Sequence, residues 1–192
     1  YSALQECSTG INNTAVGGFA GDVITTGSGS AFLGYQAGGT VTTGNYNIAV
    51  GYDAMSGGTV TGDNNIAIGA SAGDALTSGK QNILIGLNAG GAMTTCNSNV
   101  VIGVEAGDAL TSTSDIVLVG RGAGTAINST DADGSVGIGK NALLALTDGD
   151  GCTAIGFQAL ATTTTGEKNT AVGYNAMTAL PAGANKNTAI GY

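Results

Sequence analysis

The stretch Asn169-Thr170-Ala171-Val172-Gly173-Tyr174-Asn175-Ala176-Met177 is the clearest copy of a phrase that this chain repeats from end to end. Close variants occupy residues 47–55 and 65–73, and looser ones begin at Asn82 and Asn99. The central glycine recurs at intervals of 17, 18 or 19 residues, with no interval missed. A fixed short period in a chain of 192 residues predicts a solenoid with one coil per repeat. The central glycines are Gly17, Gly34, Gly51, Gly69, Gly86, Gly103, Gly120, Gly139, Gly156, Gly173 and Gly191.

We number the positions of the repeat so that Asn169 is slot one and Gly173 is slot five. Slot four is always branched and apolar, slot eight is alanine wherever the copy is complete, and slot twelve is usually a larger apolar residue. A coil of this length has room for two short strands, each followed by a glycine turn. Like slots of neighbouring coils stack about 4.8 Å apart, so we expect slots four and twelve to face each other across a thin core.

The predicted fold is therefore all-β: a parallel β-solenoid of about eleven 17–19-residue coils with two short strands per coil, in which residues 1–192 form a single continuous array. The extra residues of the longer repeats lie around Gly57-Gly58, in 129–134 and in 181–184, always between slot nine and the next slot one. Loops are therefore expected on that side. Because Tyr1 and Tyr192 both occupy slot six, we expect the chain to be a segment of a longer fibre whose coils continue end to end.

Slot three of the predicted strand is never polar, although it points away from the face that slot two shares with slot four, which is always apolar. Alternate residues of a strand point to opposite faces, and a strand that is apolar on both faces is buried on both. With slot four in the core, slot three predicts an interface with another copy of the chain. The alternative, that small alanines at slot three are tolerated in solvent, stays open. The predicted interface residues are Ala15, Phe32, Ala49, Ala67, Leu84, Val101, Leu118, Ala154, Ala171 and Ala189.

Composition excludes several classes of function. Five Lys and Arg residues against thirteen Asp and Glu give a net charge of −8, which offers nucleic acid or an anionic membrane nothing to bind. No histidine is available for acid–base or nucleophilic catalysis, and Cys7, Cys96 and Cys152 show neither CxxC spacing nor a metal pattern. We therefore expect no enzyme, no resident cofactor, no nucleic-acid partner and no membrane contact by this segment.

Other solenoid classes fit the repeat poorly. The left-handed hexapeptide helices typical of acyltransferases need apolar residues at slots four, ten and sixteen, but slot ten includes Asp22, Asp74 and Asp108. The calcium-binding nonapeptide roll needs a Gly-Gly-x-Gly-x-Asp phrase twice per coil, and no such series is present.

Two rows of side chains are candidate ligand sites. The aromatic residues of slot six either stack as a corner ladder that stiffens the edge or present a stripe that binds glycans. Threonine rows are the alternative site, for ice, because Thr40 and Thr42, and likewise Thr162 and Thr164, have the spacing that a flat ice-binding face requires. The aromatic stripe consists of Tyr1, Tyr35, Tyr52, Phe157, Tyr174 and Tyr192.

The concentrated negative charge of the chain lies in two turns that are one coil apart, and the four carboxylates are Asp131, Asp133, Asp148 and Asp150. Stacked neighbours of like charge repel unless solvent, protons or a cation intervene. Asp-x-Asp-Gly turns supply the oxygen ligands that calcium takes, so calcium is a candidate ligand of this group. The alternative is two solvated turns in which aspartate favours the turn geometry.

The phrase Asn-Thr-Ala-Val-Gly-Tyr-Asn-Ala at residues 169–176 resembles the head repeat of the trimeric autotransporter adhesins, the YadA-like β-roll. It is more similar still to the longer-period variants in tail-fibre and surface-fibre proteins of phages and bacteria. The resemblance implies a left-handed roll, a homotrimer packed about a common axis, and a location outside the cell, on a cell surface or a virion. It further implies a structural segment of an adhesive fibre or tail fibre, with host or surface glycans as partners. A glycan-binding or ice-binding module is the alternative function.

Overall fold

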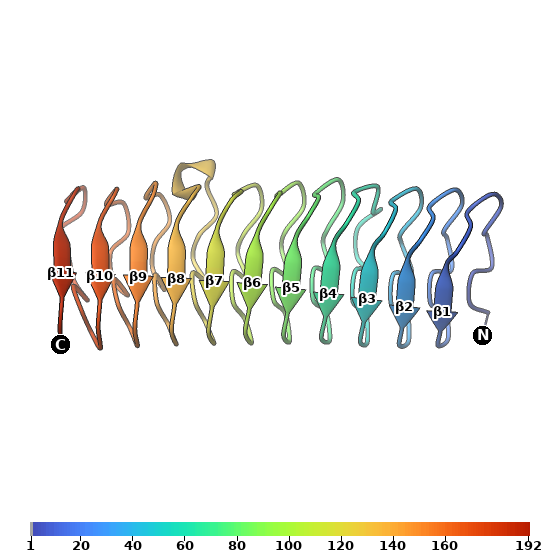
Figure 1. Cartoon of the computed structure of the whole chain (residues 1–192), viewed down its shortest axis with the longest axis horizontal. Coiled ribbons are helices and arrows are strands. Elements are labelled where there is room, and N and C mark those ends of the chain that lie inside the picture. Colours follow the sequence, from blue (N-terminus) through green and yellow to red (C-terminus); the bar gives the residue numbers. More distant parts are fainter. Residues whose placement is uncertain (1) are drawn as a thin grey trace.

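The computed structural model describes residues 2–192 and shows one continuous stack of coils (Figure 1). Each coil contributes one three-residue strand, formed by slots two to four, to a single 11-stranded parallel sheet in sequence order. The strands are β1 (Thr14–Val16), β2 (Ala31–Leu33), β3 (Ile48–Val50), β4 (Ile66–Ile68), β5 (Ile83–Ile85), β6 (Val100–Ile102), β7 (Val117–Val119), β8 (Val136–Ile138), β9 (Thr153–Ile155), β10 (Thr170–Val172) and β11 (Thr188–Ile190). The predicted parallel β-solenoid is confirmed.

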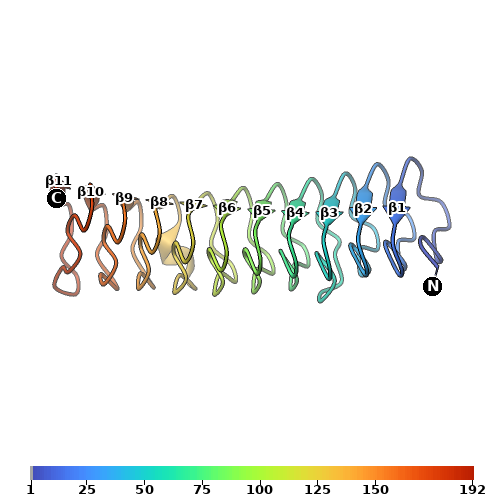
Figure 2. The same cartoon turned by 90° about the horizontal axis from the view of Figure 1, so that it is seen from below.

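The solenoid winds left-handed. In Figure 1 every strand runs down the near side of the stack, and the chain returns behind it while advancing from the N-terminal to the C-terminal end. Figure 2, seen from below, places all the strands along one edge and the loops along the other. The longest insertion forms a 3-10 helix, η1 (Thr130–Ala132), which protrudes from the loop side, as the position of the extra residues predicts. Within residues 2–192 no helix is long and apolar enough to span a membrane.

The second strand predicted in each coil does not form, apart from an isolated parallel bridge between Val41 and Val60. The reason is backbone conformation. In the coil of β5, Gly86, Asn88 and Gly90 have φ of 135°, 53° and 58°, and Gln81 before the strand has 60°. Extended backbone requires negative φ, so left-handed residues at every second position turn the chain repeatedly after the strand. The turn continues into slot twelve, where the Met93 amide donates to Gly90 O of its own coil at 3.1 Å and not to a neighbouring coil.

Hydrogen bonds along the axis continue through these turns. The amide of Asn88 donates to Ala70 O of the preceding coil (3.0 Å), whereas the amide of Gly90 donates to Ala106 O of the following coil (3.0 Å). Each turn is thus bonded in both directions along the stack, which satisfies backbone groups that would otherwise be buried without partners.

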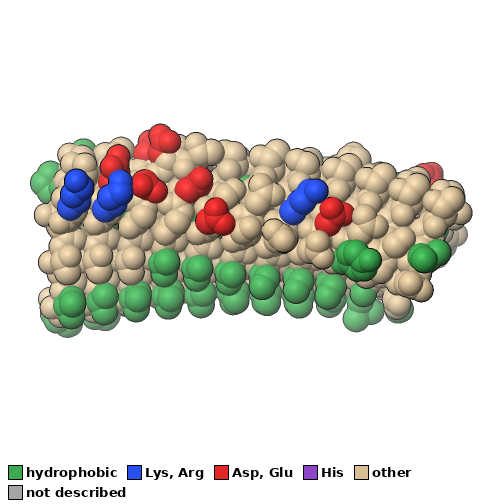
Figure 3. Space-filling model, turned by 45° about the horizontal axis from the view of Figure 1, so that its top comes forward, with side chains coloured by type: hydrophobic (Ala, Val, Ile, Leu, Met, Phe, Trp, Pro, Cys, Tyr) green, Lys and Arg blue, Asp and Glu red, His purple; other side chains and the backbone are tan. Residues whose placement is uncertain are grey.

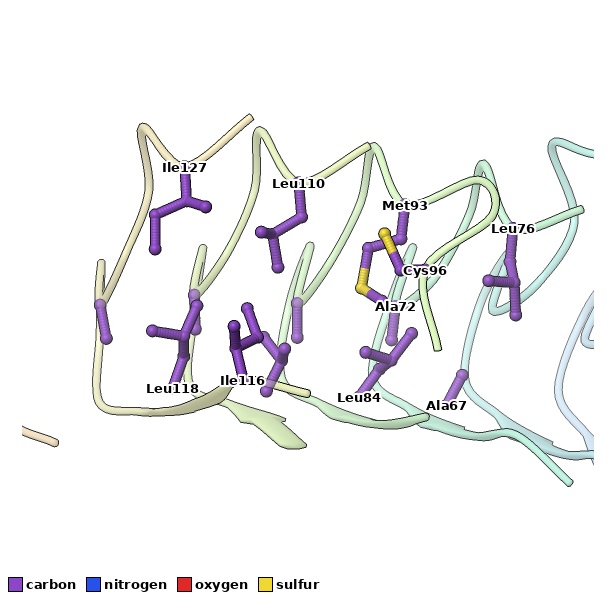
Figure 4. Packing of buried hydrophobic residues seen from close by; sticks show 14 of the residues in the cluster. Ala67, Ala72, Leu76, Leu84, Met93, Cys96, Leu110, Ile116, Leu118 and Ile127 are labelled. Carbon is purple, nitrogen blue, oxygen red and sulfur yellow. The ribbon is translucent and has the colours of Figure 1, made fainter. Parts of the chain in front are cut away.

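The core is a narrow column formed by slots three, eight and twelve. All ten slot-eight alanines are buried, which confirms the core position predicted for slot eight. Slot twelve is also in the core where it carries a large apolar residue, although Leu180 near the C-terminal end is only half-buried. The buried slot-twelve residues are Ile24, Val41, Leu76, Met93, Leu110, Ile127 and Leu146. Figure 4 shows slot-twelve side chains such as Leu110 and Ile127 pointing from one wall of the coil toward Leu118 on the strand wall.

The predicted orientation of the strand is wrong: slot three points into the core and slots two and four point outward. Leu84, Val101 and Leu118 are fully buried, whereas the slot-four residues Leu33 and Ile138 are 52% and 38% exposed. Slot three points inward because slot one does: the asparagines at slot one are buried and hydrogen bonded inside the coil. Because side chains alternate along a strand, slot three must share the inward face with slot one.

This orientation overturns the predicted interface, because side chains buried inside their own coil cannot contact another chain. The residues to which the correction applies are Ala15, Phe32, Ala49, Ala67, Leu84, Val101, Leu118, Ala154, Ala171 and Ala189. Of these, Ala15 and Ala189 in the two outermost strands are half-buried, and the others are buried.

Slots three and nine share one volume inside each coil. Where slot three is large, as in Leu118, slot nine is glycine, and a Cβ on Gly124 would lie 2.7 Å from the Leu118 methyl groups. In the coil of β9, where slot three is Ala154, slot nine is the large buried residue Leu160. Alanine at slot three does not always bring a large slot nine: Ala67 occurs with Gly73, where a Cβ would lie 2.7 Å from Leu84 of the next coil. A large side chain in one of the two slots is thus accompanied by a small residue in the other, which keeps the core closely packed.

This exchange can be tested in the coil of β7. We expect Gly124→Leu to destabilise the fold because its side chain collides with Leu118, and Leu118→Ala to destabilise it by leaving a cavity. The double variant recreates the Ala154–Leu160 pairing, so its loss should be smaller than the sum of the single losses by about 1–3 kcal/mol. Chemical denaturation of the four proteins measures this coupling. Strictly additive losses would show that the two slots do not share a volume.

The slot-five glycines set how closely successive coils approach. All of them have φ near 135°, and a Cβ built on Gly86 would lie 2.5 Å from Gly103 O in the next coil. The obstacle is backbone, which a rotamer change cannot move aside. Glycine is therefore required at slot five both for its conformation and for the space.

We expect Gly86→Ala to lower the free energy of unfolding by about 2–4 kcal/mol, because it combines an unfavourable φ with a backbone collision. Gly134→Ala is the matched control: Gly134 also has positive φ, 71°, but nothing lies within 4 Å of its added Cβ. Backbone strain alone should cost the control about 1 kcal/mol. Equal losses in the two variants, measured by urea unfolding, would contradict the role of coil-to-coil contact.

Candidate functional site: the outward strand face

The outward strand face is the surface that slots two and four of β1–β11 present to solvent. Its slot-four row is aliphatic along the entire stack, and its slot-two row is Ile or Val from β3 to β8 and mostly Thr toward the two ends. Figure 3 shows it as a hydrophobic band, and the charged side chains that are visible in this view lie above the band and not in it. The residues of this face are Thr14, Ala31, Ile48, Ile66, Ile83, Val100, Val117, Val136, Thr153, Thr170 and Thr188 in slot two, and Val16, Leu33, Val50, Ile68, Ile85, Ile102, Val119, Ile138, Ile155, Val172 and Ile190 in slot four.

The outward strand face is regular because each slot of one coil lies beside the same slot of the next coil. The parallel register pairs Ile66 with Ile83 and Ile68 with Ile85, and the same slot-to-slot pairing holds for every neighbouring pair of strands. Side chains of one slot therefore form straight rows about 4.8 Å apart along the axis. The rows contain no charged residue. The arrangement offers apolar contact and no chemistry of bond making or breaking.

The aromatic residues of slot six line one edge of the strand face and stack along the axis. The rings of Tyr35 and Tyr52 lie 5.6 Å apart and nearly parallel, and those of Phe157 and Tyr174 lie 4.9 Å apart. Tyr174 stacks in turn on Tyr192, at 5.3 Å. These are favourable offset-stacking distances, so the predicted corner ladder forms in two separate groups. Tyr1 of the predicted stripe lies outside the described residues.

This stacking leaves few ring faces free for a sugar. A pyranose binds an aromatic residue by covering its face, but the face of Tyr174 toward each neighbour is occupied by another ring. Lys140 lies over the Phe157 ring at 5.5 Å from the centroid. The adjacent Asp53 carboxylate raises the pKa of Tyr52. The geometry thus favours the structural interpretation of the stripe over the glycan-binding one.

The threonines after slot twelve are also committed to internal contacts. The hydroxyl of Thr77 donates to Thr94 O at 2.9 Å, and that of Thr94 donates to Thr111 O at 2.8 Å. Thr42 and Thr162, which belong to the rows considered for ice, donate in the same way to the next coil. The hydroxyl protons are thereby used within the stack, which is typical of a structural ladder.

The four aspartates predicted to stack do lie together, around an open hollow of about 650 Å³ on the loop side. Two of the four carboxylates have partners within the chain. Asp133 Oδ1 accepts a hydrogen bond from the Ser114 amide at 2.7 Å, and Asp150 forms an ion pair with Lys168 at 3.2 Å. Within residues 2–192, no group of three or more His, Cys, Asp or Glu side chains is arranged to hold a metal ion. Calcium at Asp131, Asp133, Asp148 and Asp150 stays a prediction of the sequence.

The three cysteines are free thiols. Cys96 and Cys152 are buried, and Cys152 Sγ donates to Gly166 O at 2.9 Å in a position where other coils have asparagine. Burial raises the pKa of both thiols, that of Cys96 to about 11. The thiolate is the nucleophilic form, so these two cysteines are built as core residues and not as reactive groups.

No family model, curated protein or solved structure matches this chain. The candidate site consequently stands on its geometry. Sequence reasoning identified a strand that is apolar on both faces but assigned the outward face to slot three. The signal for the correct assignment was the recurring Asn at slot one, whose buried side chain determines which face points inward.

The raised pKa of Cys96 makes a pH-dependent contribution to stability. The unfolded thiol ionises near its ordinary pKa of 9.0, whereas the folded thiol stays protonated to about 11, so the stability that Cys96 supplies below pH 9 is lost as the pH rises toward 11. We expect the difference in free energy of unfolding between the wild type and Cys96→Ala to shrink by about 1 kcal/mol from pH 8 to pH 10. Urea unfolding at both pH values measures it. A difference that does not change with pH would mean that the folded thiol ionises normally.

Proposed function

We propose that this chain is a structural segment of an extracellular adhesive fibre or virion tail fibre, and that it self-associates through the outward strand face, most simply as a homotrimer. The observation that carries the proposal is the continuous aliphatic row on the outside of a rigid stack. The likeness of the repeat phrase to trimeric adhesin heads and tail-fibre repeats supports the same function. In this proposal the segment provides rigid reach and surface attachment outside the cell.

The size of the strand face supports self-association. Ten rung spacings of about 4.8 Å and a width of about 12 Å give on the order of 600 Å² of apolar surface. Soluble monomers rarely expose a contiguous apolar patch larger than about 300–600 Å². A stable interface buries about 800 Å² on each partner, which the strand face and its edges together can supply. A copy of the same rod is the partner whose length and repeat match this surface at every rung.

The proposal predicts opposite outcomes for two neighbouring substitutions in β4. Ile68 is 37% exposed on the strand face, so Ile68→Asp should leave the fold intact and weaken association by placing a charge in the interface. Ala67 is fully buried, so Ala67→Asp should unfold the coil. Light scattering reports the oligomeric state and circular dichroism reports the fold.

Ser78→Asp is the matched control, because it adds the same charge at an exposed position on the loop side of the coil. It should change neither the fold nor the oligomeric state. A wild-type chain that stays monomeric at all concentrations tested would overturn the proposal. An Ile68→Asp variant that associates as the wild type does would place the interface on another surface.

A further inference from the structure

Two opposite charges flank the central strand β7 on the outward side of the coil. Asp115 lies two residues before β7 and Arg121 lies two residues after it, and both side chains are exposed. Neither forms an ion pair within residues 2–192, where the described pairs join Lys80 to Asp63 and Lys168 to Asp150 and Glu167. The strand separates the two side chains, so they cannot meet within one chain.

The chemistry of the two edges makes Asp115 unusual. We call the residue before slot one the leading edge of the strand face, and slot six the trailing edge. Asp115 is the single acidic residue in either edge, and Arg121 and Lys140 are the two basic residues of the trailing edge. The leading edge comprises Asn12, Gly29, Tyr46, Asn64, Gln81, Ser98, Asp115, Gly134, Gly151, Lys168 and Lys186. The trailing edge comprises Gly18, Tyr35, Tyr52, Ala70, Leu87, Val104, Arg121, Lys140, Phe157, Tyr174 and Tyr192.

Cyclic symmetry brings unlike edges together. When copies of a rod are related by a rotation axis parallel to their length, the leading edge of one chain meets the trailing edge of its neighbour at the same rung. At the rung of β7 this contact places Asp115 opposite Arg121. At the rung of β11 it places Lys186 opposite Tyr192, which is a favourable contact between a cation and an aromatic ring.

From this arrangement we infer that Asp115 and Arg121 form an ion pair between chains that fixes parallel, coil-for-coil register. The inference rests on the self-association proposed above and adds its polarity and register. The aliphatic rows repeat at every rung, so apolar contact alone fits equally well after a shift of one coil. A charge pair at one rung removes that degeneracy, because complementary charges set specificity and register more than affinity.

The competing arrangements pair these residues differently. A shift of one coil in one direction places Asp115 opposite Lys140 and leaves Arg121 opposite Ser98. Such a shift, repeated from chain to chain, does not close into a ring but continues as an open helix. Antiparallel rods place each edge against the same edge, so that Asp115 does not meet Arg121. Charge reversal therefore distinguishes the three arrangements.

The experiment compares the full chain with Asp115→Lys, Arg121→Asp and the double variant, by light scattering across a concentration series at low ionic strength. Lysine is suitable at the leading edge because Lys168 and Lys186 occupy that position, with the same positive φ as Asp115. Each single reversal should weaken association on the order of 2- to 5-fold, the magnitude of an exposed pair. The double variant should restore it. High salt should reduce all these differences by screening.

The matched control combines Asp115→Lys with Lys140→Asp, which reverses the pair that a one-coil shift would form. Restoration by this control, and not by Arg121→Asp, would overturn the coil-for-coil register while leaving self-association intact. Oligomers that none of the reversals affects would show that the two charges do not meet, and would overturn the inference in the same way. A monomeric wild type would overturn both the inference and the proposed function. Circular dichroism confirms that each variant is folded.

Discussion

The stack depends on the distance at which successive coils approach at the slot-five glycines. From Gly17 to Gly173, a Cβ at slot five would lie within 2.6 Å of a carbonyl oxygen in the next coil, so the backbones meet where other proteins have side chains. This contact permits the short parallel strands to hydrogen bond in unbroken register. This distance between coils sets the spacing, along the axis, of the core residues, of the outer rows and of the two edges.

A second constraint acts inside the coil. Buried asparagines form a ladder at slot one, in which the Oδ1 atoms of Asn47, Asn65 and Asn82 each accept from the backbone amide and the side-chain amide of the asparagine in the next coil. Each Nδ2 also donates to a carbonyl across its own coil, as Asn82 does to Cys96 O at 2.8 Å. Buried polar groups are costly unless they are paired, and here they are paired in both directions. The ladder holds slot three inward and leaves slots two and four for the outer face.

The repeat made the solenoid, the loop side and the core positions of slots eight and twelve predictable, because a period identifies positions that stack. Period alone does not say which side of a strand lies inside, and both sides of β5, with Leu84 between Ile83 and Ile85, are aliphatic. The missing second strand was hidden for a similar reason, since Leu143 and Leu160 have positive φ without being residue types that favour it. The acidic turns were correctly placed side by side, but the contacts of Asp133 with Ser114 and of Asp150 with Lys168 depend on how an inserted turn folds.

The hydrogen bonds between coils lie along the long axis of the rod, and this direction has a mechanical consequence. Tension applied along the axis loads the bonds between one coil and the next directly, so the rod yields by peeling coils from an end or from a weak contact. A coil of about 17 residues occupies about 4.8 Å of the rod but spans more than about 50 Å when pulled straight. Each coil released therefore lengthens the molecule roughly tenfold over the space it occupied, and the same geometry that makes the segment stiff in bending makes it extensible under load.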